Sequence, residues 1–335
     1  MIKNRSSVLV TGALRFVGLN IVYRLARVGW RVGALTRRAP DKSTLSFLGN
    51  HKSQVNWVEG DVTDRAGMQE LVQNEGITHI LHAAAVTATP DEEYFDPAKV
   101  FDVNAGGTLN MLEAGRSADV KRLVFVSSSG IYGAAPPTPL KQESESLDIT
   151  NVYTIAKQAS EHLCRRYSEL TGMSVTVGRL GSAYGPMERT TGSRLGLSRI
   201  HQAVHAALEG QEITVFGART SRDYCYVNDV AEAFASLLEA EVLNHNVYNV
   251  GGNQAETLRT ALDAIREAVP TFNWQESDDP EAASITLEAD KARAGMDLER
   301  LKADTGWCPH FDLYRGVLAY ISWLQEANHD NSQNG

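Results

Sequence analysis

The stretch Ser7-Val-Leu-Val-Thr11-Gly-Ala-Leu-Arg-Phe-Val-Gly18 decides the fold, because a glycine-containing turn in it joins a strand-like run to a helix-like run. Ser7–Thr11 is a short apolar run of β type, and the apolar spacing of Val17–Val28 is helical. Gly12 suits a tight turn, and Gly18 suits close packing of the helix on the strand. Such a turn points backbone N–H groups and a helix N-terminus at a pyrophosphate. The residues predicted to bind a dinucleotide here are Gly12, Arg15, Phe16, Val17 and Gly18.

Arginines stand at two positions that discriminate between dinucleotides. Arg15 replaces the usual middle glycine of the turn, where a side chain either helps to bind phosphate or crowds the pyrophosphate. The next strand, Arg31–Leu35, is followed by Thr36-Arg37-Arg38 instead of the acidic residue that binds the ribose 2′-OH of NAD. Guanidinium groups at this place suit a 2′-phosphate. The sequence therefore favours NADP over NAD.

Strands and helices alternate through the first half of the chain. Further strand-like segments are Gln54–Glu59, Ile80–Ala84, Leu123–Ser127 and Ser174–Gly178, and the helical segments between them are Met68–Asn74, Val100–Ala114 and Tyr153–Leu170. This order is typical of parallel strands with crossover helices. We expect an α/β protein with a Rossmann-type, doubly wound parallel sheet in residues 1–180.

The pattern loosens after about residue 180. Residues 181–325 are predicted to form mainly a smaller C-terminal α/β lobe that binds the substrate, with returns of the chain to the main sheet at about 215–250. The polar end of the chain, 326–335, is predicted to be a disordered tail.

Composition excludes several classes of protein. The 335 residues are 43% hydrophobic and 22% charged, with a net charge of −9, which argues against nucleic acid or an anionic membrane as a partner. The three cysteines have no paired spacing, so neither a disulfide framework nor a metal site is expected. No signal peptide or membrane span is evident, and a cytoplasmic location is the expectation.

A second constellation carries acid–base chemistry. In a helix over 151–171, Tyr153 and Lys157 are four residues apart and share one face. A neighbouring ammonium favours phenolate and lowers the tyrosine pKa from about 10. Such a tyrosine can exchange a proton with a secondary alcohol while hydride moves elsewhere. Ser128, at the end of an apolar strand, is placed to hydrogen-bond the same alcohol oxygen.

With these segments in place, the chain resembles an extended short-chain dehydrogenase/reductase of the NAD-dependent epimerase/dehydratase family. The resemblance spans roughly 7–325 and rests on motifs in family order. They are T-G-x-x-x-x-x-G at 11–18, G-D-V at 60–62, H-A-A-A at 82–85, Asn104, S-S-S-G-I-Y-G at 127–133, Y-T-I-A-K at 153–157, Arg179, R-D-Y at 222–224 and Y-N-V-G at 248–251.

The resemblance implies a role for each matching residue. Tyr153 would be the acid/base, Lys157 would hold the cofactor ribose, and Ser128 would bind the reacting oxygen. The further cofactor-binding residues implied are Asp61, Val62, Ala83, Ala84, Ala85, Asn104 and Leu180. Family members commonly form homodimers through the helix before the fifth strand and the Tyr-Lys helix.

The type of reaction stays open between three alternatives. Family dehydratases resemble one another in having an Asp-Glu pair after the catalytic hydroxyl, where this chain has Ser129-Gly130. That absence favours hydride transfer at one carbinol, either as a 4-epimerase or as an NADP-dependent dehydrogenase or reductase of a polyol, sugar acid or other small carbonyl compound. A non-catalytic nucleotide-binding member is the third alternative.

The substrate is predicted to be of sugar type with an acidic group. Arg222 by resemblance, and a basic series at Arg189, Arg194 and Arg199, are candidates to bind a phosphate or carboxylate. The residues predicted to face the substrate are Ser129, Arg189 and Arg222.

Overall fold

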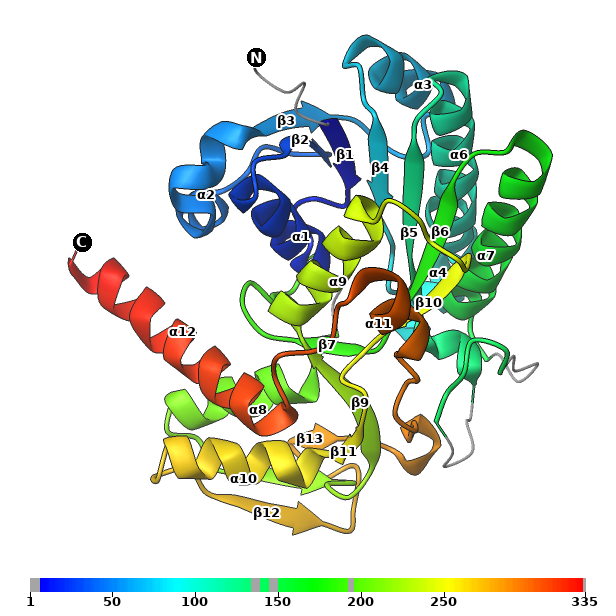
Figure 1. Ribbon diagram of the computed structural model, residues 1–335. Coiled ribbons are helices and arrows are strands. Elements are labelled where there is room, and N and C mark those ends of the chain that lie inside the picture. The colour runs from blue at the N-terminus through cyan, green and yellow to red at the C-terminus, as the bar shows by residue number, and fades with distance from the viewer. Residues whose placement is uncertain (1–6, 134–138, 145–149, 192–195, 334–335) are drawn as a thin grey trace.

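The computed structural model describes residues 7–133, 139–144, 150–191 and 196–333, and its first half alternates strands and helices (Figure 1). The strands are β1 (Ser7–Thr11), β2 (Arg31–Thr36), β3 (Val55–Glu59), β4 (His79–His82), β5 (Arg122–Ser128) and β6 (Val175–Leu180). The helices between them are α1 (Phe16–Arg27), α2 (Lys42–Leu48), α3 (Arg65–Asn74), α4 (Pro90–Phe95), α5 (Pro97–Phe101), α6 (Gly107–Ser117) and α7 (Val152–Thr171). Short helical turns are η1 (Gly49–Gln54), η2 (Asp102–Gly106) and η3 (Ser129–Tyr132).

The central sheet has seven strands in the order β10-β6-β5-β4-β1-β2-β3, and every neighbouring pair is parallel. The chain reverses direction across the sheet between β1 and β4, as in a doubly wound Rossmann fold. The predicted fold class is therefore confirmed. All five residues of β1 are buried, because helices cover both faces of the sheet.

Two hydrophobic layers enclose the sheet. On one face, α1 packs beside α9 (Val227–Glu239), and on the other α3, α6 and α7 lie side by side (Figure 1). Each helix turns a stripe of apolar residues toward the strands, as the 3.6-residue period requires. Leu25 and Phe234 belong to the first layer, and Met111 and Cys164 to the second.

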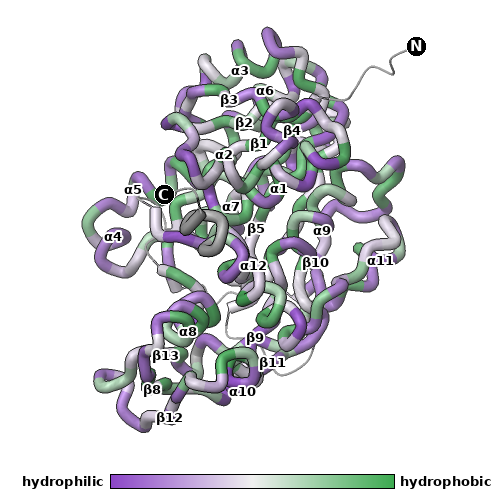
Figure 2. The backbone as a smooth tube through the Cα atoms, turned by 90° about the vertical axis from the view of Figure 1, so that its left-hand side faces the viewer, coloured by the Kyte–Doolittle hydropathy of each residue, from purple (hydrophilic) through white to green (hydrophobic). Residues whose placement is uncertain are grey.

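The second half forms a smaller lobe with its own core, seen below the main sheet in Figure 2. One small sheet joins β7 (Ser182–Tyr184), β9 (Ser221–Tyr226) and β11 (Ala255–Thr257), and another joins β8 (Ile213–Phe216), β12 (Trp274–Ser277) and β13 (Ile285–Thr286). The remaining helical segments are α8 (Arg199–Leu208), α10 (Leu258–Ala268), η4 (Ala289–Lys291), α11 (Glu299–Thr305) and α12 (Leu313–Gln333). Within the expected return at 215–250, β10 (Val247–Val250) pairs with β6.

Several boundaries differ from the sequence-based expectation, and three of them have a clear physical reason. The helix expected over Val100–Ala114 is interrupted by a π turn, η2, in which the Asn104 amide donates to the Val100 carbonyl at 2.8 Å. β4 ends at His82 and not at Ala84, because Thr11 Oγ1 takes the N–H groups of Ala83 and Ala84. Helix α12 continues to Gln333, through most of the predicted disordered tail, since no glycine or proline interrupts residues 317–333.

No helix in the described parts of the chain combines the length and the apolar composition that crossing a bilayer demands.

Candidate active site

The turn between β1 and α1 has the close contacts that its glycines predict. Gly12 has φ +69°, and a Cβ added to it would lie 2.8 Å from the Ala83 carbonyl oxygen. A Cβ on Gly18 would lie 2.3 Å from the Gly12 carbonyl oxygen. Arg15 has φ −90°, an ordinary extended conformation, so this position does not require glycine. The Arg15 side chain makes no capping hydrogen bond to α1, and the first turn of the helix holds no acidic residue.

A buried hydrogen-bonded chain fixes this turn against β4 and the π turn. Thr11 Oγ1 accepts from Ala83 and Ala84, so its proton is directed to His82 Nδ1 at 2.7 Å. Burial, with a contribution from the Lys157 charge, lowers the pKa of His82 to about 3, and the ring is neutral. His82 Nε2 therefore donates to Thr108 Oγ1 at 3.2 Å. These contacts form a rigid floor beneath the turn.

A cavity of about 360 Å³ opens above this floor at the carboxyl ends of β1, β2 and β4. Its wall combines apolar side chains with cationic ones, as a nucleotide site requires. Of the residues predicted to bind cofactor, Gly12, Arg15, Arg37, Arg38, Asp61, Val62, Ala84 and Ala85 line it. Sequence reasoning missed Leu14, Leu35, Thr36, Gly60, Val86 and Val103, of which Leu14 was signalled by its place inside the turn.

The arginines at this cavity are crowded. Burial, with the positive charges of Arg37, Arg38 and Arg189, lowers the pKa of Arg15 to about 10. Arg37 pairs with Asp61 at 3.6 Å, although the Arg37 side chain is 54% exposed. Arg189, predicted to face the substrate, does not line the cavity; it donates to Asp41 at the start of α2, and its charge acts on Arg15. Like charges gathered in this way favour an anionic ligand.

Four further residues that were predicted to bind the cofactor do not line this cavity. Asn104 is buried, and its side chain bonds to the N–H and C=O of Val86 and to the Val100 carbonyl, so it shapes the cavity wall from behind. Phe16 is buried in the first turn of α1, where Val17 is partly buried. Leu180 pairs in register with Ser128 on β5.

Helix α7 places the predicted acid–base pair. Asn151 caps the helix by accepting the Thr154 N–H at 2.8 Å, and Tyr153 and Lys157 follow one turn apart. Lys157 is 2% exposed and donates to the Val126 carbonyl at 2.8 Å. Its ammonium lies 4.6 Å from the Phe125 ring centroid and 5.8 Å from that of Tyr153. Burial lowers the pKa of Lys157 to about 8, so it is mainly charged at neutral pH.

Ser128 ends β5 at the same edge of the sheet. Its Oγ accepts the Gly130 N–H at 3.1 Å and caps η3, which leaves the hydroxyl proton for another acceptor. Ser129, predicted to face the substrate, is 8% exposed. A Cβ on Gly130 would lie 3.2 Å from Ser128 Oγ and 3.4 Å from Thr154 Oγ1. Any side chain at position 130 would therefore start beside the serine hydroxyl.

A buried ion pair lies behind these residues. Arg179 on β6 binds Glu161 on α7 at 2.7 Å, and Ser127 Oγ donates to the same carboxylate. Arg179 also donates to Tyr132 and to the Gln142 carbonyl. This network joins α7 to β5 and β6 and holds the helix that carries Tyr153.

On the side of the smaller lobe, Arg222 Nε donates to Ser182 Oγ at 3.0 Å. Arg199 donates to the Thr286 carbonyl at 2.6 Å. Both arginines lie on the lobe, whereas Arg189 does not join them. Arg194 lies outside the described residues.

Asp229, Glu232 and His310 form a separate polar cluster whose ligand atoms lie within 4.8 Å of one another. Asp229 accepts the N–H groups of His310 and Phe311, and Glu232 lies 3.4 Å from Arg24 and 3.6 Å from Arg27. Asp229 and Glu232 thus have partners within the chain.

Comparison with known proteins gives a consistent family. A model of the "NAD dependent epimerase/dehydratase family" matches residues 8–251, which is more than half of the 335 residues. A dTDP-glucose 4,6-dehydratase from Xanthomonas campestris is 28% identical, over 94% of this chain and 92% of that protein. A putative UDP-glucose 4-epimerase from Methanocaldococcus jannaschii is 26% identical, over 96% of this chain and 99% of that protein.

Solved structures show the same architecture. The UDP-glucose 4-epimerase of Thermus thermophilus, in complex with NAD, has a TM-score of 0.77 and 29% identity and covers 94% of this chain and 98% of its own. That of Thermotoga maritima, with UDP-glucose, has a TM-score of 0.80 at 24% identity and covers 96% and 99%. The second likeness concerns the fold alone.

Proposed function

The chain belongs to the NAD-dependent epimerase/dehydratase family of extended short-chain dehydrogenase/reductase enzymes, and we propose that it transfers hydride at one carbinol of a sugar-type substrate with Tyr153 as acid/base. The observation that carries this proposal is the buried Lys157 ammonium, 5.8 Å from the Tyr153 ring, beside a strand end that presents Ser128.

The cavity fits part of a dinucleotide. Its volume of about 360 Å³ holds a part of such a molecule, and Gly12, which packs too closely on Ala83 to carry a Cβ, keeps the turn beside the cavity free of a side chain at this position. The start of α1 is suited to a pyrophosphate, and Leu14, Val62 and Val86 supply apolar walls for a flat ring. A bound nicotinamide would supply the hydride acceptor and donor.

The chain's own residues then handle the proton. The Lys157 charge favours ionisation of the Tyr153 hydroxyl, which takes a proton from a substrate alcohol or returns it to a ketone. The Lys157 ammonium is held by the Val126 carbonyl on β5, so its charge is fixed between this strand and α7. Ser128 presents its hydroxyl proton to the reacting oxygen, since its own oxygen already accepts from Gly130. Ser128 and the Lys157 ammonium are held by hydrogen bonds before substrate arrives, which reduces the cost of orientation.

Elimination is disfavoured at this site. A dehydratase needs an additional acid and base beside the reacting carbon, and position 130, beside Ser128 Oγ, is glycine. The reaction proposed is therefore a 4-epimerase-like oxidation and reduction at a single carbon, even though one of the relatives is a dehydratase.

A second candidate follows from the arginines at the cavity. Arg15, Arg37 and Arg38 favour NADP, whose 2′-phosphate they suit as charge-assisted donors. NADP preference with free exchange of the cofactor fits a dehydrogenase or reductase better than an epimerase, which recycles a held cofactor. The substrate in either case is of sugar type, nucleotide-linked or not, with Arg222 as a contact for its acidic group.

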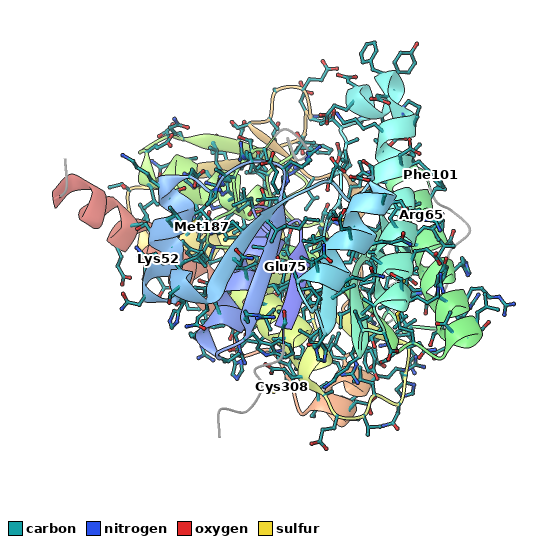
Figure 3. All side chains as sticks on the ribbon, turned by 90° about the horizontal axis from the view of Figure 1, so that it is seen from above. Lys52, Arg65, Glu75, Phe101, Met187 and Cys308 are labelled. Atoms are coloured by element: carbon teal, nitrogen blue, oxygen red, sulfur yellow. The ribbon has the colours of Figure 1, made fainter. Side chains whose placement is uncertain are left out.

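Exposed apolar residues support a homodimer. Among the apolar residues of α6 and α7, Leu112 is fully buried and Leu163 packs on the core, whereas Ile155 on α7 is 46% exposed. Phe101 on α5, labelled in Figure 3, is 42% exposed. We assign Ile155 and Phe101 to the dimer face, and Ile155→Asp is expected to shift a size-exclusion peak from dimer to monomer.

The decisive experiment compares Tyr153→Phe with Tyr167→Phe on the same helix. Nucleotide released from the purified protein is identified first, and NADPH and NADH are then titrated by fluorescence. Epimerisation and reduction are assayed with UDP-glucose and UDP-glucuronate. Tyr153→Phe is expected to lower kcat about 10³-fold while the cofactor Kd stays within threefold.

Tyr167 hydrogen-bonds Glu113 away from the cavity, so its variant is expected to retain activity. Near-native turnover by Tyr153→Phe would overturn the proposal. Tightly held nucleotide would select the epimerase, and freely exchanging NADPH the reductase.

A further inference from the structure

Arg189 is brought to the nucleotide end by the segment that follows β7. Asn20 on α1 donates to the Pro186 carbonyl at 3.0 Å and fixes the start of this segment against the first turns of the helix. Met187, labelled in Figure 3, has φ +65° and packs against the same core as α1. The chain thus directs Arg189 toward α2.

The guanidinium of Arg189 is held by three groups at the start of α2. It donates to Asp41 Oδ2 at 2.9 Å, to Ser43 Oγ at 2.9 Å and to Thr44 Oγ1 at 3.0 Å. The side chain is 26% exposed, so it is oriented but still in reach of solvent. Asp41 follows the end of β2 by five residues and is the N-cap of α2.

Asp41 uses only one of its two carboxylate oxygens to bind Arg189. Its Oδ1 accepts the Thr44 N–H at 2.8 Å and the Ser43 hydroxyl at 2.9 Å, so one oxygen is already used by the cap. Although burial raises it, the hydrogen bonds of Thr44 and Ser43 and the charge of Arg189 hold the pKa of Asp41 below its ordinary value. Asp41 is thus an anion at every physiological pH and orients Arg189 without covering it.

The charges around the cavity match a phosphomonoester. The charges of Arg37, Arg38 and Arg189 all act on Arg15. Of these four guanidinium groups, Arg37 pairs with Asp61 and Arg189 pairs with Asp41. This leaves an excess of two positive charges, while a phosphomonoester carries about −1.5 to −2 at pH 7. NADH, which lacks this phosphate, would leave the excess unbalanced.

We propose that Arg189 is the fourth arginine of the cofactor 2′-phosphate site and that Asp41 is its positioning residue. The inference rests on the proposed use of NADP. It moves Arg189 from the substrate to the cofactor and makes the segment after β7 a determinant of cofactor choice. Arg189 adds charge-assisted attraction for the phosphate, while Asp41 holds the guanidinium and weakens that attraction by its own charge.

The test measures Kd for NADPH and NADH in the full-length wild type, Arg189→Gln, Arg189→Lys and Asp41→Asn. Arg189→Gln is expected to raise the NADPH Kd about 5- to 20-fold and to leave the NADH Kd within twofold. Arg189→Lys is expected to restore part of the loss, because it keeps the charge without the planar fork. Asp41→Asn retains the helix cap and removes the charge, so the NADPH Kd is expected to fall about two- to fivefold.

Arg219→Gln is the matched control, since Arg219 is 80% exposed on the lobe and pairs with Glu276. Equal weakening of both cofactors by Arg189→Gln would show a structural role only and overturn the inference. Weaker NADH binding by Asp41→Asn, with NADPH unchanged, would also overturn it, because Asp41 would then be a ribose acceptor. If Arg189→Gln does not fold, Asp41→Asn decides alone.

The test distinguishes failure of the proposed use of NADP from failure of the role proposed for Arg189. Wild type that prefers NADH contradicts the proposed use of NADP and this inference with it. Wild type that prefers NADPH, with selectivity unchanged in Arg189→Gln, contradicts this inference alone.

Discussion

Arg179 and the arginines around the nucleotide cavity have opposite electrostatic surroundings. Arg179 is 3% exposed, and hydrogen bonds to Glu161 and the Glu161 charge raise its pKa, although burial alone would lower it. Arg15 is half-buried beside three other arginines, and its pKa falls to about 10. The first guanidinium is satisfied within the chain, and the second is surrounded by like charges.

The difference separates structural charge from binding charge. A buried ion pair with further hydrogen bonds stabilises one arrangement of helix and strand, and it has no remaining capacity for a ligand. A cluster with excess positive charge is unfavourable until an anion arrives, so it contributes little to the apo fold and much to binding. Four experiments test this contrast, from the largest expected effect to the smallest.

Glu161→Gln is expected to lower the free energy of unfolding by about 3–5 kcal/mol, because it leaves Arg179 buried without its counter-charge. Urea denaturation measures the change. The matched control is Glu169→Gln, which breaks the exposed pair with Arg166 and is expected to cost less than about 0.5 kcal/mol. A loss below about 1 kcal/mol for Glu161→Gln would remove the distinction between the two groups.

Arg37→Ala is expected to raise the Kd for NADPH by about 10- to 100-fold, as loss of a charge-assisted hydrogen bond of about 1.5–3 kcal/mol implies. The unfolding free energy of the apo protein is expected to change by less than about 1 kcal/mol, since the Arg37–Asp61 pair is largely exposed. Fluorescence titration and urea denaturation give the two values. Arg27→Ala, at another exposed pair, should change neither, and a large loss of apo stability in Arg37→Ala would contradict the assignment.

Lys157 is a third kind of cation, buried without a carboxylate partner. Its folded pKa of about 8 is below the ordinary 10.5, so between these values the unfolded chain binds more protons and stability rises with pH. Relative to Lys157→Met, the wild-type free energy of unfolding is expected to increase by about 1 kcal/mol from pH 8 to pH 9. Parallel pH profiles for the two proteins would show that burial does not lower this pKa.

Salt is expected to weaken the binding of NADPH more than the binding of NADH. Raising NaCl from about 0.1 to 1 M shortens the Debye length from about 10 to 3 Å, which screens the exposed Arg37 and Arg38 from a phosphate. The NADPH Kd is expected to rise about fivefold and the NADH Kd less than twofold. An equal response of both would indicate that the arginines act on the shared pyrophosphate.

Much of the fold was predictable because it depends on local pattern. The alternation of strands and helices and the turn at Gly12 and Gly18 required only apolar periodicity and glycine chemistry. The π turn at η2 was not predictable, because its helix has uninterrupted helical spacing in the sequence. The end of β4 depends on Thr11, which is 72 residues away from Ala83 in the chain.

The predicted acid–base pair and the arginines show the same limit of prediction from sequence. Spacing alone put Tyr153 and Lys157 on one helical face, and a strand end implied the neighbouring Arg37 and Arg38. Arg189 was assigned to the substrate because it lies in a basic series with Arg194 and Arg199, yet its partner is Asp41, 148 residues earlier. Asn104 was assigned to the cofactor, whereas its amide is used by three backbone groups.

The sequence by itself determined the Rossmann architecture and the family, and it predicted the acid–base residues, because each depends on short-range spacing. Only the tertiary structure decided how Lys157 is desolvated and which arginine is satisfied by Glu161. It also decided which arginines crowd around the nucleotide cavity. Those properties depend on burial and on distances between residues far apart in the chain. A local sequence pattern carries no information about either.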